Sequence, residues 1–316
     1  MDNERVGPFE PDVAALLPLL APLGRPPVEQ LSVADARAAY RAARESVQWK
    51  PVAVAEVVDQ APGQGQLPAM RIYRPDPTCD SAPAILFFHG GGWVIGDLDT
   101  YDSLCRKLAV ESNRTVLSVD YRLAPAHRFP AAVDDSLAIY AAVIAQAASL
   151  RIDASDIAVC GDSAGGTLAA VVALASLARD LPAPSAVVLF YPVTDLRCLT
   201  PSYQSISGVP LTAATMFWFR DHYLNDLSEA EDWRASPLLA SVPAGFPPTF
   251  ITSAGHDPLC DEAFLFADHL RAAGVLVEHR HIPGQIHGYM GLSGVVAEAG
   301  LSLAAAVEFL KVGART

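Results

Sequence analysis

The segment Gly-Asp-Ser-Ala-Gly-Gly at residues 161–166 decides the fold of this 316-residue chain, because it links an expected strand directly to an expected helix. Residues 156–160 are typical of a short buried strand, and the alanine-rich run at 168–177 is typical of a helix. Only small residues fit beside the centre of so sharp a turn, whose strained backbone presents Ser163 Oγ at its tip. Taken alone, the pattern also fits a glycine-rich turn that has no chemical role.

A second glycine motif, His-Gly-Gly-Gly-Trp at residues 89–93, follows the buried strand expected at 82–88. Three successive glycines let backbone N–H groups approach a ligand with no side chain in the way. Two such groups, together with the amide after the nucleophile, form an oxyanion hole in strand–turn–helix hydrolases. We assign the three donors to Gly91, Gly92 and Ala164.

His89 and Asp162 are predicted to support this site without taking part in the chemistry. His89 leads the glycine loop, where an imidazole can brace the backbone by hydrogen bonding. Asp162 directly precedes the nucleophile. That position points away from the reacting centre on such a turn, so we expect a structural hydrogen bond from it.

The acid of a catalytic triad should follow the serine along the chain and precede the histidine. Asp257 comes just after a strand expected at 248–253, where such an acid would sit. Asp261 is the alternative, but it precedes a helix expected at 262–273 and fits the N-cap of that helix. We therefore favour Asp257 as the acid.

The base is expected in the loop after the last strand, which the pattern places at 275–282, and His287 is the candidate. His279 and His281 share one face of that strand. A His-x-His pair can ligate zinc, but the sequence places no third ligand, so we interpret both as half-exposed strand residues. Three further histidines are expected on the surface or packed in helices: His256, His222 and His269.

Alternating strand and helix patterns predict an α/β fold with a mostly parallel, eight-stranded sheet that starts antiparallel. The strand-like runs lie near 52–58, 67–73, 83–88, 115–119, 157–160, 186–190, 248–252 and 275–282. Helical patterns separate the later runs, as they do in βαβ units.

Residues 198–233 break this alternation with an aromatic-dense helix inserted between two strands. Together with residues 1–50, which include a helix capped by Ser32, they are interpreted as a helical cap over Ser163. The catalytic domain then comprises residues 51–197 and 234–316. The expected pocket residues are Trp93, Phe217 and Trp218, although aromatic runs are also typical of a protein core.

Composition restricts the function classes. The net charge of −13 argues against a nucleic-acid partner, and no apolar run reaches the ~18 residues of a membrane helix. Five cysteines without metal-type spacing predict reduced thiols, and the start of the chain lacks signal-peptide features, so we expect a cytoplasmic protein. The expected partner is a small molecule, and neither a metal nor an organic cofactor is required.

Seven short motifs together resemble those of the hormone-sensitive-lipase-like (family IV) carboxylesterases, a branch of the α/β-hydrolase superfamily. They lie at residues 89–93, 121–125, 127–132, 161–166, 191–192, 257–259 and 287–288, and span most of the chain. One departure is Ala126, which stands where that family usually has a glutamate. We interpret that glutamate as structural, so its loss bears on a local ion pair.

The resemblance implies an α/β-hydrolase fold with a helical cap, and a serine carboxylesterase acting on short- to medium-chain acyl esters through an acyl-enzyme. It also allows a homodimer. The same triad and hole serve amidases and peptidases, so an amidase is an alternative. A non-catalytic ligand-binding member of the fold and a lipase for long acyl chains are further alternatives.

Overall fold

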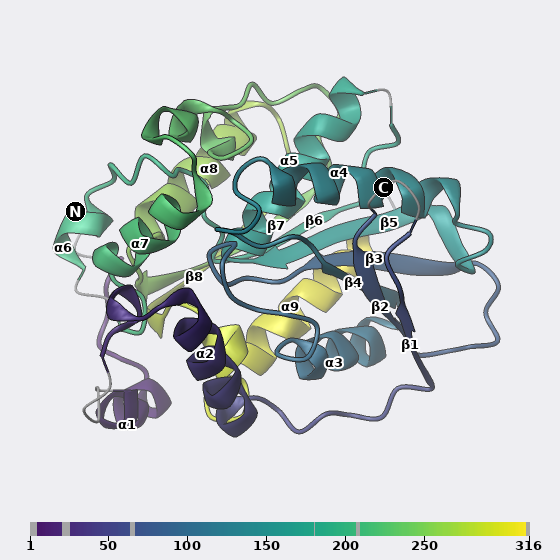
Figure 1. Ribbon diagram of the computed structural model, residues 1–316. Coiled ribbons are helices and arrows are strands. Elements are labelled where there is room, and N and C mark those ends of the chain that lie inside the picture. The colour runs from purple at the N-terminus through teal and green to yellow at the C-terminus, as the bar shows by residue number, and fades with distance from the viewer. Residues whose placement is uncertain (1–4, 21–25, 64–66, 180, 207–208, 314–316) are drawn as a thin grey trace.

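An eight-stranded sheet forms the centre of the computed structural model, which describes residues 5–20, 26–63, 67–179, 181–206 and 209–313 (Figure 1). The strand order is β1-β2-β4-β3-β5-β6-β7-β8. The pairs β1–β2 and β2–β4 are antiparallel, and all later pairs are parallel. The predicted fold class, with its antiparallel start, is confirmed.

Each strand overlaps its predicted run, but β5 begins five residues earlier than predicted and β8 ends four residues later. Their bounds are β1 (Glu56–Gln60), β2 (Ala69–Arg74), β3 (Ala82–Phe88), β4 (Thr115–Asp120), β5 (Ile152–Asp162), β6 (Val187–Phe190), β7 (Thr249–His256) and β8 (Val277–Ile286). Along β3 the side chains alternate between two cores: Leu86 and Phe88 belong to one, and Ile85 and Phe87 to the other. Both faces of the sheet are therefore buried at this strand, as expected for parallel strands covered by helices.

Helices cover both faces of this sheet (Figure 1). Helices α4 (Ala131–Ala145), α5 (Ala164–Ala178) and α8 (Cys260–Ala272) cover one face, and α3 (Asp102–Ser112) and α9 (Glu298–Gly313) cover the other. The remaining helical elements are α1 (Pro11–Leu20), η1 (Val28–Gln30), α2 (Val33–Val47), α6 (Ser202–Ser205), α7 (Ala213–Tyr223), η3 (Leu227–Glu231), η4 (Pro237–Leu239) and η5 (Tyr289–Leu292).

The elements predicted to form a cap gather at the end of the sheet where β7 and β8 finish (Figure 1). Ser32 caps α2 as predicted, accepting a hydrogen bond from Asp35 N at 3.1 Å. Thr215 of α7 donates to the Glu29 carboxylate of η1 at 3.0 Å, which ties the two parts together. Residues 1–4, 21–25 and 207–208 of the predicted cap lie outside the described residues.

One detail of the prediction is wrong: Asp261 is not an N-cap. The turn after Asp257 is already helical, because Cys260 N donates to Asp257 O at 3.0 Å. Helix α8 therefore begins at Cys260, with Leu259 as its N-cap residue. The Asp261 carboxylate instead accepts from Arg5 Nη1 at 2.7 Å and from Ser202 N at 2.9 Å, which joins α8 to the N-terminal segment and to α6.

His279 and His281 flank the hydroxyl of Ser253 on β7, at 2.8 and 2.9 Å. Burial lowers the pKa of His279 to about 4 and also lowers the pKa of His281. Within the described residues, no three His, Cys, Asp or Glu side chains are grouped to hold a metal ion. The helices described there also lack the combined length and apolar character needed to cross a bilayer.

The lowered pKa of His279 predicts an acid-sensitive stability. The unfolded chain, with an ordinary pKa of 6.5, binds a proton that the folded chain takes up only near pH 4, so stability falls as pH drops from 6.5 toward 4. In His279→Gln, the loss of unfolding free energy between pH 7 and pH 5 should be smaller by roughly 1–2 kcal/mol. Urea titrations at both pH values measure this.

The matched control is His127→Gln, which alters an exposed histidine of a loop. In this variant the unfolding free energy should change between pH 7 and pH 5 by the same amount as in the wild type. If the unfolding free energy of His279→Gln fell with pH as steeply as that of the wild type, the link between the lowered pKa of His279 and acid sensitivity would be contradicted.

Candidate active site

Ser163 lies on the turn between β5 and α5 with an unusual backbone, φ 52° and ψ −120°. The turn is tight because Gly161 and Gly165 approach other backbone atoms. A methyl group on Gly161 would overlap the Gly165 carbonyl, and one on Gly165 would overlap the carbonyl of Phe88 on β3. The glycines of the motif are thus required by packing, and the strand and helix meet with the serine at the tip.

The three side chains predicted as nucleophile, base and acid are brought together by the ends of three strands. Ser163 Oγ lies 3.0 Å from His287 Nε2, and His287 Nδ1 lies 2.7 Å from Asp257 Oδ2. Their exposed fractions are 7%, 8% and 1% for Ser163, His287 and Asp257. Asp257 Oδ1 also accepts from Leu259 N at 2.9 Å, which fixes the carboxylate. The competing acid, Asp261, pairs with Arg5 instead.

Tyr191 orients the His287 ring, a contact that the sequence analysis did not identify. Tyr191 follows β6 and has a φ of 38°. Its ring meets the imidazole edge to face, with centroids 4.8 Å apart. Its hydroxyl accepts from Met290 N at 3.2 Å, just beyond the histidine. The imidazole is therefore held by a carboxylate on one side and by a fixed aromatic ring on another.

The glycine loop at residues 89–93 begins where β3 ends, beside the carboxyl end of β5. The Gly91 carbonyl accepts from Val94 N at 3.0 Å and from Ile95 N at 2.9 Å, which closes a tight turn. Gly92 has a φ of 59°, and a methyl group there would overlap the Phe219 ring of α7. Phe219 is not among the predicted site residues, and its signal in the sequence was the aromatic run of α7. Ala164 opens α5, so its N–H lacks an acceptor within the helix.

His89 lies inside this loop, fully buried. Its Nδ1 is 2.8 Å from the Gly90 carbonyl, and Tyr121 stacks on its ring at 4.3 Å while donating its hydroxyl proton to the His89 carbonyl. Burial lowers the pKa of His89 to about 4. The ring is therefore neutral near pH 7, and Nδ1–H donates to the carbonyl, an arrangement suited to a support of the loop.

Asp162 joins the two glycine motifs through its side chain. Its side chain is buried, with Oδ1 accepting from Gly90 N at 2.7 Å and Oδ2 accepting from the Tyr101 hydroxyl at 3.0 Å. The serine turn and the glycine loop are thus held together by one carboxylate.

The three residues predicted to line a pocket differ in their surroundings. Trp93 has no exposed surface and stacks on Tyr223 at 4.3 Å. Phe217 is 39% exposed, and Trp218 is half-buried beside Phe219. Of the three residues, Phe217 and Trp218 have exposed surface and Trp93 has none.

A family model described as an α/β-hydrolase fold matches residues 85–291, which is well over half of the chain. This chain belongs to the α/β hydrolases. The match runs from β3 to η5, so it contains the serine turn, the glycine loop and His287. The family assigned from the motifs, the hormone-sensitive-lipase-like branch, is confirmed.

Curated relatives of this chain are named as carboxylic ester hydrolases. The ethyl acetate hydrolase of Pseudomonas putida is 39% identical over 316 residues, covering 96% of this chain and 98% of the relative. Carboxylesterase NlhH of Mycobacterium tuberculosis is 41% identical over 236 residues, covering 73% of each chain.

Solved structures agree with this family. A thermostable esterase from Pseudomonas putida has a TM-score of 0.91 at 35% identity, covering 98% of each chain. A hyperthermophilic esterase from the archaeon Pyrobaculum calidifontis has a TM-score of 0.89 at 34% identity, covering 98% of this chain and 99% of that one. Both similarities extend over nearly the whole α/β-hydrolase domain and its additional helices.

The geometry predicts that Asp257 matters far more than Asp261. In Asp257→Asn the carboxylate that holds the His287 imidazole in the tautomer with a proton on Nδ1 is lost. The kcat for p-nitrophenyl acetate should therefore fall about 10³–10⁴-fold. Asp261→Asn removes a charge that contacts Arg5, and kcat should stay within about threefold. Initial rates of both purified variants test this, and the reverse order of losses would transfer the acid role to Asp261.

Proposed function

We propose that the protein is a serine carboxylesterase that hydrolyses short- to medium-chain acyl esters through an acyl-enzyme intermediate. The observation that carries this proposal is the hydrogen-bonded series Ser163 Oγ, His287 and Asp257, with separations of 3.0 and 2.7 Å. A nucleophile, a base and a group that orients the base are the minimum that such chemistry needs.

Acylation begins when Ser163 Oγ attacks the ester carbonyl and transfers its proton to His287 Nε2. Asp257 holds Nδ1–H and stabilises the imidazolium that forms. The carbonyl oxygen becomes an oxyanion and accepts from the amides of Gly91, Gly92 and Ala164; each such donor typically contributes roughly 3 kcal/mol to lowering the barrier. His287 then gives its proton to the leaving alcohol.

Deacylation repeats these steps with water as the nucleophile. His287 takes a proton from the water as it attacks the acyl carbonyl, and the same amides accept the second oxyanion. The proton returns to Ser163 Oγ as the carboxylic acid departs, and the enzyme is restored. His89 and Asp162 support the loop and the turn while these groups react.

Residues 1–50 and 198–233 act as a helical cap over a catalytic domain of residues 51–197 and 234–316. The seating of Phe219 against Gly92 supports this division, since it joins the inserted helix to the loop that carries the oxyanion donors. In the proposal, Phe217 and Trp218 contact the apolar part of the substrate. The names of the relatives, among them an ethyl acetate hydrolase, favour small esters.

The proposal extends to a cytoplasmic enzyme. All five cysteines are free thiols, and four of them are buried: Cys105, Cys160, Cys198 and Cys260. Unpaired thiols of this kind are typical of proteins in a reducing compartment.

Removal of the nucleophile tests the central claim. We expect the wild type to hydrolyse a p-nitrophenyl ester series from acetate to palmitate with a maximum at short or medium chains. Ser163→Ala should lose at least about 10³-fold in kcat while keeping its circular dichroism spectrum, because it removes the hydroxyl that lies 3.0 Å from His287 Nε2. Turnover by the variant above a tenth of wild type excludes Ser163 as the nucleophile.

The base assignment is tested by two histidine variants. His287→Ala removes the proton acceptor and should reduce kcat by about 10³-fold or more. His281→Ala, on the strand that leads to His287, loses a contact with Ser253 and should keep kcat within about threefold of wild type. Equal losses in the two variants, measured on the fraction that is folded, would contradict the assignment.

A further inference from the structure

Helix α2 carries three arginines on one face, and this face contacts the segment that follows the glycine loop. Arg37, Arg41 and Arg44 are spaced four and three residues apart, so they share one face of the helix. Arg37 donates to the Val94 carbonyl at 2.8 Å and to the Ala124 carbonyl at 3.0 Å. A helix that belongs to the proposed cap thus contacts the residue that directly follows the glycine loop.

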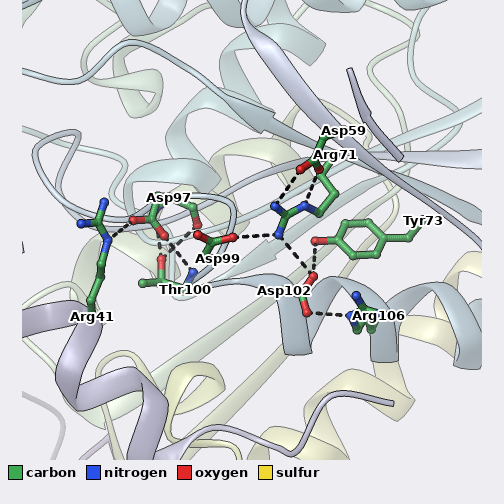
Figure 2. A network of polar contacts seen from close by, with 9 residues as sticks. All are labelled: Arg41, Asp59, Arg71, Tyr73, Asp97, Asp99, Thr100, Asp102 and Arg106. Carbon is green, nitrogen blue, oxygen red and sulfur yellow. Dashed lines mark hydrogen bonds and ion pairs between the residues drawn. The ribbon is translucent and has the colours of Figure 1, made fainter. Parts of the chain in front are cut away.

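Two of these arginines occupy very different surroundings. Arg41 pairs with Asp97 at 2.6 Å, and its side chain is 60% exposed. Figure 2 shows this pair at one edge of a polar network whose other part surrounds Arg71 with three aspartates. Arg44, by contrast, is 8% exposed and lies between the rings of Tyr40 and Tyr101, 4.8 and 5.0 Å from their centroids.

Arg44 reaches the active site through a single hydroxyl group. Its Nη2 donates to the Tyr101 hydroxyl at 3.1 Å and also to the Tyr40 hydroxyl. The Tyr101 hydroxyl donates to Asp162 Oδ2 at 3.0 Å and accepts from Gly90 N at 3.1 Å. The Tyr101 hydroxyl therefore connects the Arg44 guanidinium to the Asp162 carboxylate and to the Gly90 backbone. Asp162 precedes Ser163, and Gly90 precedes the proposed oxyanion donors.

The guanidinium also fills a space beside the loop that carries the base. A methyl group on Gly291 would overlap Arg44 Nη1. Gly291 lies in η5, four residues after His287. The Arg44 side chain therefore contacts both η5 and Tyr101, and only glycine at position 291 leaves room for it.

We propose that Arg44 is a positioning residue for the reaction: through Tyr101 and Asp162 it holds Gly90, and so sets the Gly91 and Gly92 amides where the oxyanion forms. This inference rests on the proposed esterase function. Its physical basis is that a buried carboxylate holds two donors well only while it is charged. Burial raises the pKa of Asp162, and the Arg44 charge acts against that rise.

The first test replaces Arg44 and measures kcat and KM separately with p-nitrophenyl acetate. Misplaced oxyanion donors weaken binding of the transition state and leave substrate binding unchanged. We expect Arg44→Met to lower kcat about 10–100-fold with KM within about twofold, and Arg44→Lys to recover part of the loss. Arg41→Met is the matched control on the same helix, and its kcat should remain within about twofold of wild type.

A second readout distinguishes positioning from a general anchoring of the helix. A trifluoromethyl ketone forms a hemiketal with the serine, which places a negative oxygen among the proposed donors, whereas the matching methyl ketone tests binding of the chain alone. In Arg44→Met the inhibition constant of the trifluoromethyl ketone should rise by the same factor by which kcat falls. The inhibition constant of the methyl ketone should change little. An anchor that only stabilises the fold would change neither inhibition constant for the folded protein.

Gly291→Ala provides an independent perturbation that leaves Arg44 in the sequence. The added methyl must displace the guanidinium, so kcat should fall as it does in Arg44→Met. In an Arg44→Ala background the same substitution should cost little more, because the space is then vacant. Gly300→Ala is the control, since the nearest atom to its added methyl lies 3.9 Å away.

The outcomes separate this inference from the proposed function. A wild type inactive on every ester overturns the proposed function, and the role of Arg44 falls with it. An active wild type whose Arg44→Met and Gly291→Ala variants both keep kcat within about twofold overturns the role of Arg44 alone. If Arg44→Met does not fold, Gly291→Ala, which displaces the guanidinium and leaves the arginine in the sequence, carries the same criterion.

Discussion

The close approach of strand β5, helix α5 and strand β3 around Ser163 is the constraint on which the rest of the site depends. Because Gly165 packs against the carbonyl of Phe88, the serine turn and the start of the glycine loop lie side by side. Asp162 then ties Gly90 to the turn with a 2.7 Å hydrogen bond. Ser163 and the glycine loop beside it are consequently placed by one short stretch of backbone packing.

The ends of neighbouring parallel strands bring Asp257 and His287 together. Asp257 and His287 each follow directly after a strand, and β7 and β8 are neighbours with matching ends, since His256 is paired with Ile286. Two side chains thirty residues apart in sequence thus meet at 2.7 Å without a dedicated linking structure. Tyr191, which follows β6, adds an aromatic contact in the same row of strand ends.

Features with a local signature could be predicted from the sequence. The strands, the Ser32 cap and the glycine motifs each have a pattern contained within about ten residues. Strand ends were less accurate: β8 continues through Pro283 and Gly284, where a loop was expected. The helix near Asp261 was also misplaced, because a hydrogen-bonded turn at Asp257 begins it earlier than an acidic N-cap would.

Contacts between distant segments left no such signature. Phe219 against Gly92, Tyr191 against His287 and Arg44 against Gly291 each depend on the packing of two elements far apart in the chain. The local sequence of α7 does not indicate that Phe219 contacts the glycine loop whereas Phe217, on the same helix, is 39% exposed. The enclosed position of Trp93 follows in the same way from Tyr223, which lies 130 residues further along the chain.

The seating of Phe219 on Gly92 has a consequence for how this scaffold can be altered. The inserted segment leaves the sheet after β6 and returns at β7, and these strands are direct neighbours. Segments of other lengths can therefore be exchanged there without changing the register of any strand. Phe219 fills the space above Gly92, so the residue that an exchanged segment places there decides what covers the glycine loop.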